Sequence, residues 1–376
     1  MEPTMNTAVL RQTNRRRVLQ YLYDRGEPAT KQEIAGELSL SLPTVTGNLA
    51  ELLEEGLVSC SGTQESTGGR KPRTYALEPG ARVAVGITVQ RGEVRFLAID
   101  MRVQELGCRE VPLDFTHTAE YYETLSLYLE AFLDDFHLDR NRLLGVGITL
   151  PGIIDQTEGK LVMAPTLELW DVPLEELYRY FSRYPVFIEN DANASGYAER
   201  WMEKGQNNMV YVALERGIGG AIFWGDKQYT GDHGRSGEFG HLRIVPNGRL
   251  CHCGRRGCLE AYCSVSRLSD DLGLTLGEFF SALREGDQQA AAIWEEYRDH
   301  LTDALANLRT NFDCDIVLGG ALSPYLEELL PEICWDLGEK TLFEGDSFFL
   351  RLDHFGPHSA CAGTALRFID DFLLTF

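Results

Sequence analysis

Three cysteines lie within eight residues in the stretch Cys251-His252-Cys253-Gly254-Arg255-Arg256-Gly257-Cys258. Three thiolates and one imidazole fill a closed tetrahedral zinc site, and the two glycines allow the tight chain path that such a site needs. The fourth ligand is His241 or His252. His252 stands between two cysteines and would have difficulty pointing inward with them, so His241 is favoured. We therefore predict a structural Zn²⁺ bound by His241, Cys251, Cys253 and Cys258.

The cellular setting follows from the cysteine count and from the lack of long apolar runs. Nine cysteines is an odd number, and the polar N-terminus does not read as an export signal. No apolar run approaches the roughly 20 residues that span a bilayer. These features predict a cytoplasmic protein with reduced thiols and no membrane partner.

The net charge of −22, from 57 acidic and 35 basic residues, is unevenly distributed. Residues 1–75 hold nine basic and nine acidic side chains, so the other 301 residues carry the whole excess. The basic residues of the first segment cluster at 11–17 and 70–73, where we expect DNA to lie. The net charge of the whole chain disfavours nucleic-acid binding. The distribution of charge along the chain, however, favours DNA contact through the N-terminal segment alone.

Three helix-like stretches occupy this segment. Apolar residues recur at helical spacing at 18–22 and 34–38, and again in a third stretch from Ser41 to Glu55, where Val45, Leu49, Leu52 and Leu53 predict a buried stripe. Ser41 and Pro43 suit a helix start, and Gly56 suits its end. A turn of three residues, 39–41, separates the second and third helices. The pattern is typical of a helix-turn-helix.

A basic glycine-containing tip, Gly68-Gly69-Arg70-Lys71-Pro72-Arg73, follows between two short strand-like runs and predicts a wing. In a winged helix-turn-helix the third helix enters the major groove and the wing meets phosphates or the minor groove. The predicted DNA contacts are Ser41, Thr44, Thr46, Asn48, Arg70, Lys71 and Arg73, with Gly47 among the exposed residues. The alternative is a three-helix protein-interaction module.

The remaining 300 residues repeat one order of elements. Strand-like runs at 83–89 and 94–99 form a probable hairpin, followed by a helix at 119–136 and buried strands at 144–150 and 186–188. A second hairpin at 209–214 and 218–224 precedes helices and a strand at 315–318. The repetition predicts a duplicated α/β fold with a ligand cleft between two lobes.

These motifs together resemble a known family. One stretch resembles the signature of the ROK family of repressors, open reading frames and sugar kinases. It consists of Glu238-Phe239-Gly240-His241 and a following C-x-C-G-x-x-G-C-x-E motif that ends at Glu260. The resemblance covers nearly the whole chain and implies a two-lobe actin/hexokinase-like (RNase H-like) fold. A winged helix-turn-helix joined through GGRKP is similar to the family's xylose, glucose and N-acetylglucosamine repressors.

The resemblance also implies a sugar site. Its residues would be Asn190, Asp191, Glu238, His241 and Glu260. Carboxylates and amides recognise vicinal hydroxyls through paired hydrogen bonds, and a zinc-bound imidazole can offer its second nitrogen to a ligand. Thr166 stands where the family often has asparagine, which removes one amide able to contact the sugar.

Two loops that bind phosphate in the family's sugar kinases are altered here, which favours a repressor over a kinase. Asp191 matches the kinase general base, but Thr88, Gln90 and Arg91 replace the aspartate and the two glycines of the first phosphate loop. Glu215 adds negative charge to the second loop. We therefore predict no catalytic residue and no enzyme activity, with an ATP-dependent sugar kinase carrying an accessory DNA-binding module as the alternative.

The predicted protein is a sugar-responsive transcriptional repressor of carbohydrate metabolism. Its domains are 1–78 for the winged helix-turn-helix, 79–190 with about 360–376 for the first lobe, and 191–359 for the second. Its expected partners are operator DNA, a monosaccharide inducer or corepressor, and further copies of itself in a homodimer or homotetramer. A pocket that meets a phosphotransferase protein instead of a sugar is a third possibility.

Overall fold

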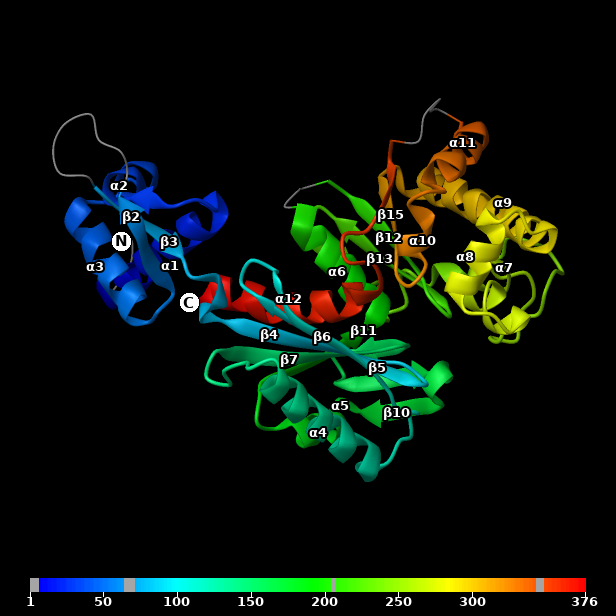
Figure 1. Cartoon of the computed structure of the whole chain (residues 1–376), viewed down its shortest axis with the longest axis horizontal. Helices are drawn as coiled ribbons and strands as arrows, with labels where there is room; N and C mark the ends of the chain where they lie inside the picture. Colours follow the sequence, from blue (N-terminus) through cyan, green and yellow to red (C-terminus); the bar gives the residue numbers. More distant parts are fainter. Residues whose placement is uncertain (1–6, 64–71, 204–206, 343–347) are drawn as a thin grey trace.

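The computed structural model describes residues 7–63, 72–203, 207–342 and 348–376. It contains an N-terminal module and two α/β lobes, with the C-terminal helix running between them (Figure 1). Within these residues, no helix combines the length and hydrophobicity that a membrane span requires.

The N-terminal module is the predicted winged helix-turn-helix. Its helices are α1 (Thr7–Arg25), α2 (Lys31–Leu38) and α3 (Leu42–Glu54). A three-stranded sheet adds β1 (Ala29–Thr30), β2 (Val58–Thr63) and β3 (Arg73–Leu77) in the order β1-β3-β2. Ser41 caps α3, since its hydroxyl accepts from the Thr44 amide at 3.2 Å. The predicted wing residues Arg70 and Lys71 lie outside the described residues.

Two predictions about α3 are wrong. Asn48 is only 3% exposed, because it lies between Val45 and Leu49 on the face that packs into the module's core. Leu53 is 39% exposed, since it lies at the margin of the stripe formed by the buried residues. Thr46 and Gly47 are exposed as expected, while Thr44 is half-buried.

The basic cluster at 11–17 makes contacts within the protein. Arg11 and Arg15 form ion pairs with Glu51 and Glu55 at the end of α3. The neighbouring guanidinium groups donate to backbone carbonyls, Arg16 to Leu374 and Arg17 to Leu38. These arginines therefore join α1 to α2, α3 and the C-terminal helix, a structural role that the sequence did not predict.

The two lobes have matching sheets, which confirms the predicted duplication. The first has the order β11-β7-β4-β5-β6 and the second β14-β13-β12-β15-β16. In each, three strands are parallel neighbours and two follow as an antiparallel meander. The strands of the first are β4 (Val83–Val89), β5 (Glu93–Asp100), β6 (Glu105–Pro112), β7 (Leu143–Leu150) and β11 (Val186–Asn190). Those of the second are β12 (Met209–Leu214), β13 (Ile218–Trp224), β14 (Lys227–Tyr229), β15 (Asp315–Gly319) and β16 (Leu350–Leu352).

Helices cover these sheets and fill the space between them. In the first lobe, α4 (Ala119–Asp135) and α5 (Leu174–Tyr178) accompany a small sheet of β8 (Ile153–Asp155), β9 (Lys160–Ala164) and β10 (Leu169–Pro173). The second lobe carries α7 (Glu260–Cys263), α8 (Leu276–Arg284), α9 (Gln288–Phe312), α10 (Ser323–Leu326) and α11 (Leu330–Lys340). Between the lobes, α6 (Asp191–Glu203) packs on β12 and β13, α12 (Ser359–Thr375) packs on β4, β5 and β7, and the two helices pack on each other.

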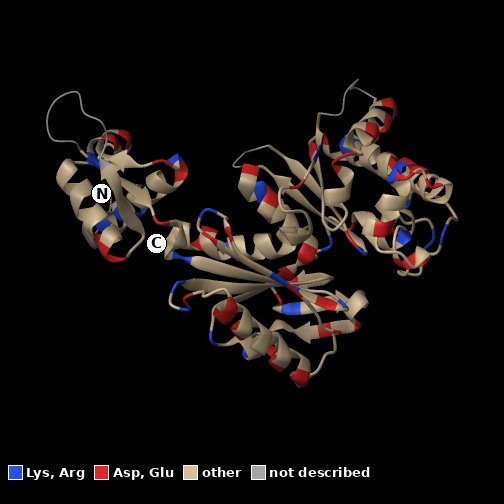
Figure 2. Cartoon of the chain, viewed as in Figure 1, with Lys and Arg blue, Asp and Glu red and all other residues tan. Residues whose placement is uncertain are grey.

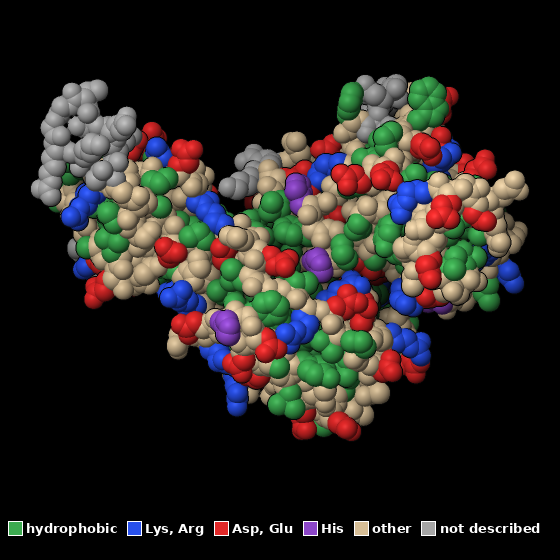
Figure 3. All heavy atoms as spheres, in the orientation of Figure 1, with side chains coloured by type: hydrophobic (Ala, Val, Ile, Leu, Met, Phe, Trp, Pro, Cys, Tyr) green, Lys and Arg blue, Asp and Glu red, His purple; other side chains and the backbone are tan. Residues whose placement is uncertain are grey.

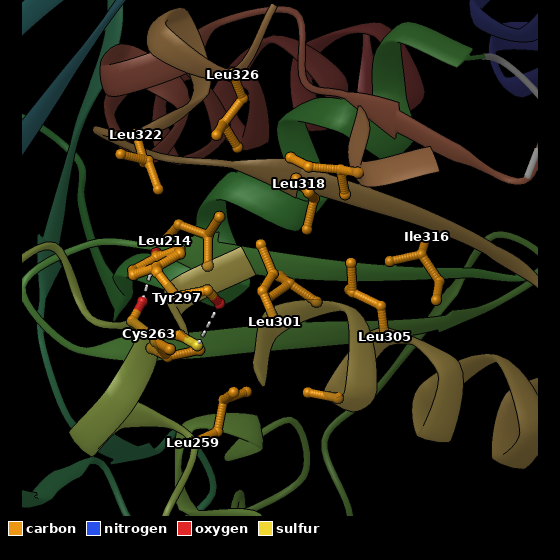
Figure 4. Packing of buried hydrophobic residues seen from close by; sticks show 14 of the residues in the cluster. Leu214, Leu259, Cys263, Tyr297, Leu301, Leu305, Ile316, Leu318, Leu322 and Leu326 are labelled. Atoms are coloured by element: carbon orange, nitrogen blue, oxygen red, sulfur yellow. Dashed lines mark hydrogen bonds between the residues drawn. The ribbon is translucent and has the colours of Figure 1, made fainter. Parts of the chain in front are cut away.

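The core of the second lobe anchors the segment that follows the cysteines. Leu259 and Cys263 lie among buried leucines of α9 and β15 (Figure 4). Tyr297 on α9 donates its hydroxyl to the Cys263 carbonyl at 2.6 Å. The chain just after Cys258 is therefore fixed in a well-packed interior.

The N-terminal module shares its core with the first lobe. Buried residues of α1 and α3 form one apolar cluster with residues of β4, β5, α6 and α12. Arg102, at the end of β5, donates to the Leu22 and Tyr23 carbonyls near the end of α1, at 3.1 and 2.5 Å. Tyr23 packs edge-on against Trp201 of α6, with ring centroids 6.2 Å apart. The module is thus held against α6, α12 and the first lobe.

Candidate functional site

The predicted metal ligands come together in one loop of the second lobe. One ligand atom from each of His241, Cys251, Cys253 and Cys258 lies within 4.8 Å of all the others. Cys253 Sγ is 3.8 Å from Cys258 Sγ, and Cys251 Sγ is 3.8 Å from His241 Nδ1. A tetrahedron with Zn–S bonds of about 2.3 Å has edges of about 3.8 Å. The donor set and its spacing therefore fit a zinc ion.

The loop backbone explains this convergence. Gly254 and Gly257 have φ of +84° and +83°, a conformation that favours glycine. A side chain at Gly257 would also collide with the Val245 carbonyl, 1.7 Å from the position of a Cβ. The Cys251 amide donates to the Arg255 carbonyl at 2.8 Å, which closes the turn between the cysteines.

His252 lies beside the cluster, with its Nδ1 3.9 Å from Cys251 Sγ, but pairs more closely with Glu260. Its Nδ1 lies 2.5 Å from Glu260 Oε1, and Glu260 Oε2 accepts from the Ile218 amide at 3.0 Å. Glu260 therefore connects the cysteine loop to the turn between β12 and β13. This contact favours His241 over His252 as the fourth ligand.

Asn190 and Asp191 lie where β11 ends and α6 begins. Asn190 Nδ2 donates to the Gly152 carbonyl at 2.8 Å and to Asp191 Oδ1 at 3.1 Å. The Ala192 amide also donates to Asp191 Oδ1, at 2.9 Å. Burial raises the pKa of Asp191 to about 6, and the backbone hydrogen bonds only partly oppose this shift. The carboxylate is thus held in place at an energetic cost.

The remaining predicted sugar ligands are connected to Asp191, directly or through one another, by charge interactions. Glu238 is exposed on one side, and desolvation of its other side, followed by the charges of Asp191 and Glu260, raises the pKa of its carboxyl group. His241 follows on the same turn, where its backbone amide donates to the Glu238 carbonyl at 3.1 Å. Charge interactions thus link Glu238 to Asp191 and Glu260, and His241 to Glu260, while Asn190 bonds to Asp191. Thr166, by contrast, is exposed between β9 and β10.

The altered phosphate loops are filled by the protein's own groups. Thr88 is buried, with its hydroxyl 3.0 Å from Cys361 Sγ on α12 and 2.9 Å from Thr149 Oγ1. Glu215 Oε1 accepts from the Ala321 amide at 2.9 Å, so a carboxylate occupies the glycine turn after β15. Burial raises the pKa of Glu215 to about 7, while Arg95 opposes the shift. Arg91 lies apart in an exposed ion pair with Glu168.

Sequence reasoning missed the contributions of Glu189, Arg367 and Gln228. Glu189 on β11 and Arg367 on α12 form a two-point ion pair directly before the candidate sugar residues. Gln228 on β14 accepts from the same guanidinium at 2.9 Å. No motif joins three residues so far apart in the chain, although the carboxylate in the Glu189-Asn190-Asp191 stretch was a visible signal.

Replacing Asp191 with asparagine should stabilise the protein at neutral pH. Because the folded-state pKa exceeds the usual 3.8, the aspartate's contribution to stability falls as pH rises from about 4 to about 6. Asparagine retains the acceptor oxygen without the charge, so we expect a gain of about 3 kcal/mol at pH 7.5 and little gain at pH 4. Urea unfolding at both pH values measures the difference, with the exposed Asp232→Asn as control. An equal effect at both pH values would contradict a charge penalty at Asp191.

The fold and the site define a two-lobe α/β protein with an attached DNA-binding module. The chain belongs to the ROK family, whose model matches residues 84–365. A winged helix-turn-helix DNA-binding model matches residues 11–59. These matches confirm the resemblance found in the sequence.

Several relatives are named as repressors. The putative xylose repressor of Caldicellulosiruptor sp. is 29% identical over 70% of this chain, and the match spans 66% of that repressor. The xylose repressor of Bacillus subtilis is 26% identical over 93% of both chains. The transcriptional dual regulator NagC of Escherichia coli is 25% identical over 87% of this chain and 85% of its own length.

Solved structures show the same fold. A ROK family transcriptional regulator, homologous to the E. coli MLC protein, covers 97% of this chain and 98% of its own, with 24% identity and a TM-score of 0.74. A ROK family glucokinase from Streptomyces griseus, in complex with glucose and AMPPNP, covers 76% and 98% with 24% identity and a TM-score of 0.65. The regulator shares the N-terminal region as well as the two lobes.

Proposed function

We propose that this protein is a sugar-responsive transcriptional repressor of carbohydrate metabolism genes. The observation that carries the proposal is one chain in which a winged helix-turn-helix shares its core with α12, the helix that runs between the two lobes of the ROK fold. Relatives over 85% or more of the chain are named as xylose repressor and as a DNA-binding regulator. A monosaccharide would bind one inter-lobe arrangement more tightly and thereby change operator affinity.

Specific residues would carry these roles. Asn190, Asp191, Glu238, His241 and Glu260 would contact the sugar, and Ser41, Thr44, Thr46, Arg70, Lys71 and Arg73 would contact DNA. A Zn²⁺ held by His241, Cys251, Cys253 and Cys258 would brace the loop that carries Glu260. A homodimer or homotetramer would present two modules to a palindromic operator.

The domain boundaries follow the same proposal: 1–78, 79–190 with about 360–376, and 191–359. Packing of α12 on β4, β5 and β7 supports its assignment to the first lobe. Packing of α6 on β12 and β13 supports a boundary near Asp191. The proposed protein works in the cytoplasm, where operator DNA is accessible.

Sugar binding without phosphorylation tests the ligand half of this proposal. A thermal-shift panel of D-xylose, D-glucose and N-acetyl-D-glucosamine should raise the melting temperature for one sugar, because a ligand that binds only the folded state stabilises it. The same sugar with ATP should release no ADP above background, since Glu215 and Thr88 fill the phosphate loops. Turnover that disappears in Asp191→Asn would instead establish the kinase alternative.

A further inference from the structure

One side chain of the interlobe helix α12 contacts both lobes. Arg367 donates from Nε and a terminal nitrogen to the two oxygens of Glu189, at 3.2 and 2.8 Å. The same terminal nitrogen lies 2.9 Å from Gln228 Oε1. Glu189 belongs to β11 of the first lobe and Gln228 to β14 of the second. Arg367 therefore bridges β11 of the first sheet and β14 of the second.

Burial and stacking hold the Arg367 guanidinium in one orientation toward Glu189. The Glu189 side chain is 10% exposed, and the guanidinium of Arg367 lies 3.6 Å from the ring centroid of Tyr197 on α6. Tyr197 in turn donates its hydroxyl to Asp370 at 2.7 Å. A planar guanidinium can stack and bind both carboxylate oxygens at once, which a lysine ammonium cannot do. Because Glu189 directly precedes Asn190, this contact fixes the strand end that presents the sugar ligands.

The Gln228 contact depends on how the lobes are arranged. Gln228 Nε2 is buried and lacks a hydrogen-bond partner among the residues described, so the bond from Arg367 to Oε1 holds this amide. A rotation of one lobe on the other would separate β14 from α12 and break this bond. The contact thus belongs to one inter-lobe arrangement and favours it over others.

The far end of α12 holds the DNA-binding module. Arg16 of α1 donates to the Leu374 carbonyl at 2.6 Å, and the Arg15 guanidinium lies 4.4 Å from the Phe376 ring centroid. Leu374 is seven residues beyond Arg367, about 10 Å along the helix. One rigid helix therefore touches the sugar-site strand, the second lobe and the module.

We propose that Arg367 is a positioning residue that couples the sugar site to the DNA-binding module through its bonds to Glu189 and Gln228. This inference rests on the proposed repressor function. The Glu189 bond orients the site, and the Gln228 bond sets which inter-lobe arrangement α12 transmits to α1.

The test compares full-length variants in a two-ligand titration. A duplex selected from a random library with the wild-type protein serves as operator, and the sugar of the xylose, glucose and N-acetylglucosamine panel with the largest thermal shift serves as effector. The readout is the ratio of operator Kd with and without that sugar. Gln228→Ala removes the hydrogen bond to β14 and keeps the Glu189 and Tyr197 contacts of Arg367, whereas Arg367→Lys removes the two-point contact.

Arg351→Lys is the matched control. Arg351 is 27% exposed against 26% for Arg367, and it pairs with the buried Glu199 of α6 within the second lobe. We expect both Gln228→Ala and Arg367→Lys to reduce the sugar-dependent ratio by about fivefold, while Arg351→Lys changes it less than about twofold. A wild-type ratio in folded Gln228→Ala overturns this inference. A wild-type protein that ignores every sugar overturns the proposed function instead.

Discussion

Cys258→Ser is expected to abolish zinc binding and to lower the free energy of unfolding by about 4 kcal/mol. Cys258 is buried, and its sulfur lies 3.8 Å from Cys253 Sγ in a group of four convergent donors. A ligand present at 1,000 times its Kd stabilises the folded state by about 4 kcal/mol, which the variant would lose. Metal analysis and urea unfolding measure the two effects.

Cys314→Ser is the control for this experiment, because Cys314 is also buried in the second lobe but lies outside the donor group. It should retain one zinc per chain. A chelator should destabilise the wild type and leave Cys258→Ser unchanged. Since the loop also holds Glu260 against the Ile218 amide, loss of zinc should weaken sugar binding as well. A wild-type protein that contains no zinc and ignores chelators would contradict the structural role of the metal.

Thr46→Glu should weaken operator binding by at least about 100-fold, the second large effect. Thr46 is exposed near the start of α3, the helix that enters the major groove in this class of module. A carboxylate at that position faces phosphates and base-edge acceptors, and close like charges cost several kcal/mol. Binding of the selected duplex at two salt concentrations measures the loss.

The matched control is Thr310→Glu on α9, which changes the same residue type at an exposed helical position far along the chain. Acidic side chains already lie over the visible face of both lobes, so this variant should bind operator as the wild type does (Figures 2 and 3). Equal affinities for Thr46→Glu and wild type would show that α3 does not face DNA. Unchanged melting temperatures would confirm that both variants fold.

The sequence predicted the elements with strong local patterns. The hairpin strands β12 and β13 have the expected bounds, since two continuous apolar runs flank a glycine-containing turn. Edge strands β6 and β14 were not predicted, because the polar and charged residues of exposed edges weaken the apolar pattern. The burial of Asn48 was missed for a related reason: its polarity outweighed its position beside Val45 and Leu49 on the buried face.

In the candidate site, too, the sequence predicted what a local motif encodes and missed contacts between distant residues. The cysteine spacing indicated a tetrahedral donor set, which the four convergent ligand atoms now support. The pairing of Arg11 and Arg15 with α3 was hidden, because a run of arginines does not reveal which carboxylates the fold brings near it. The bridge through Arg367 was also hidden, since residues 189, 228 and 367 meet only once both sheets are formed.

The most direct test of the central claim is a sugar titration against operator-bound protein, followed by fluorescence anisotropy of the labelled duplex. The sugar that raises the melting temperature should change operator affinity by at least about tenfold, and Asp191→Asn, which keeps the fold, should bind operator without responding to that sugar. An operator affinity that stays constant while the sugar demonstrably binds would contradict the coupling of sugar site and DNA-binding module.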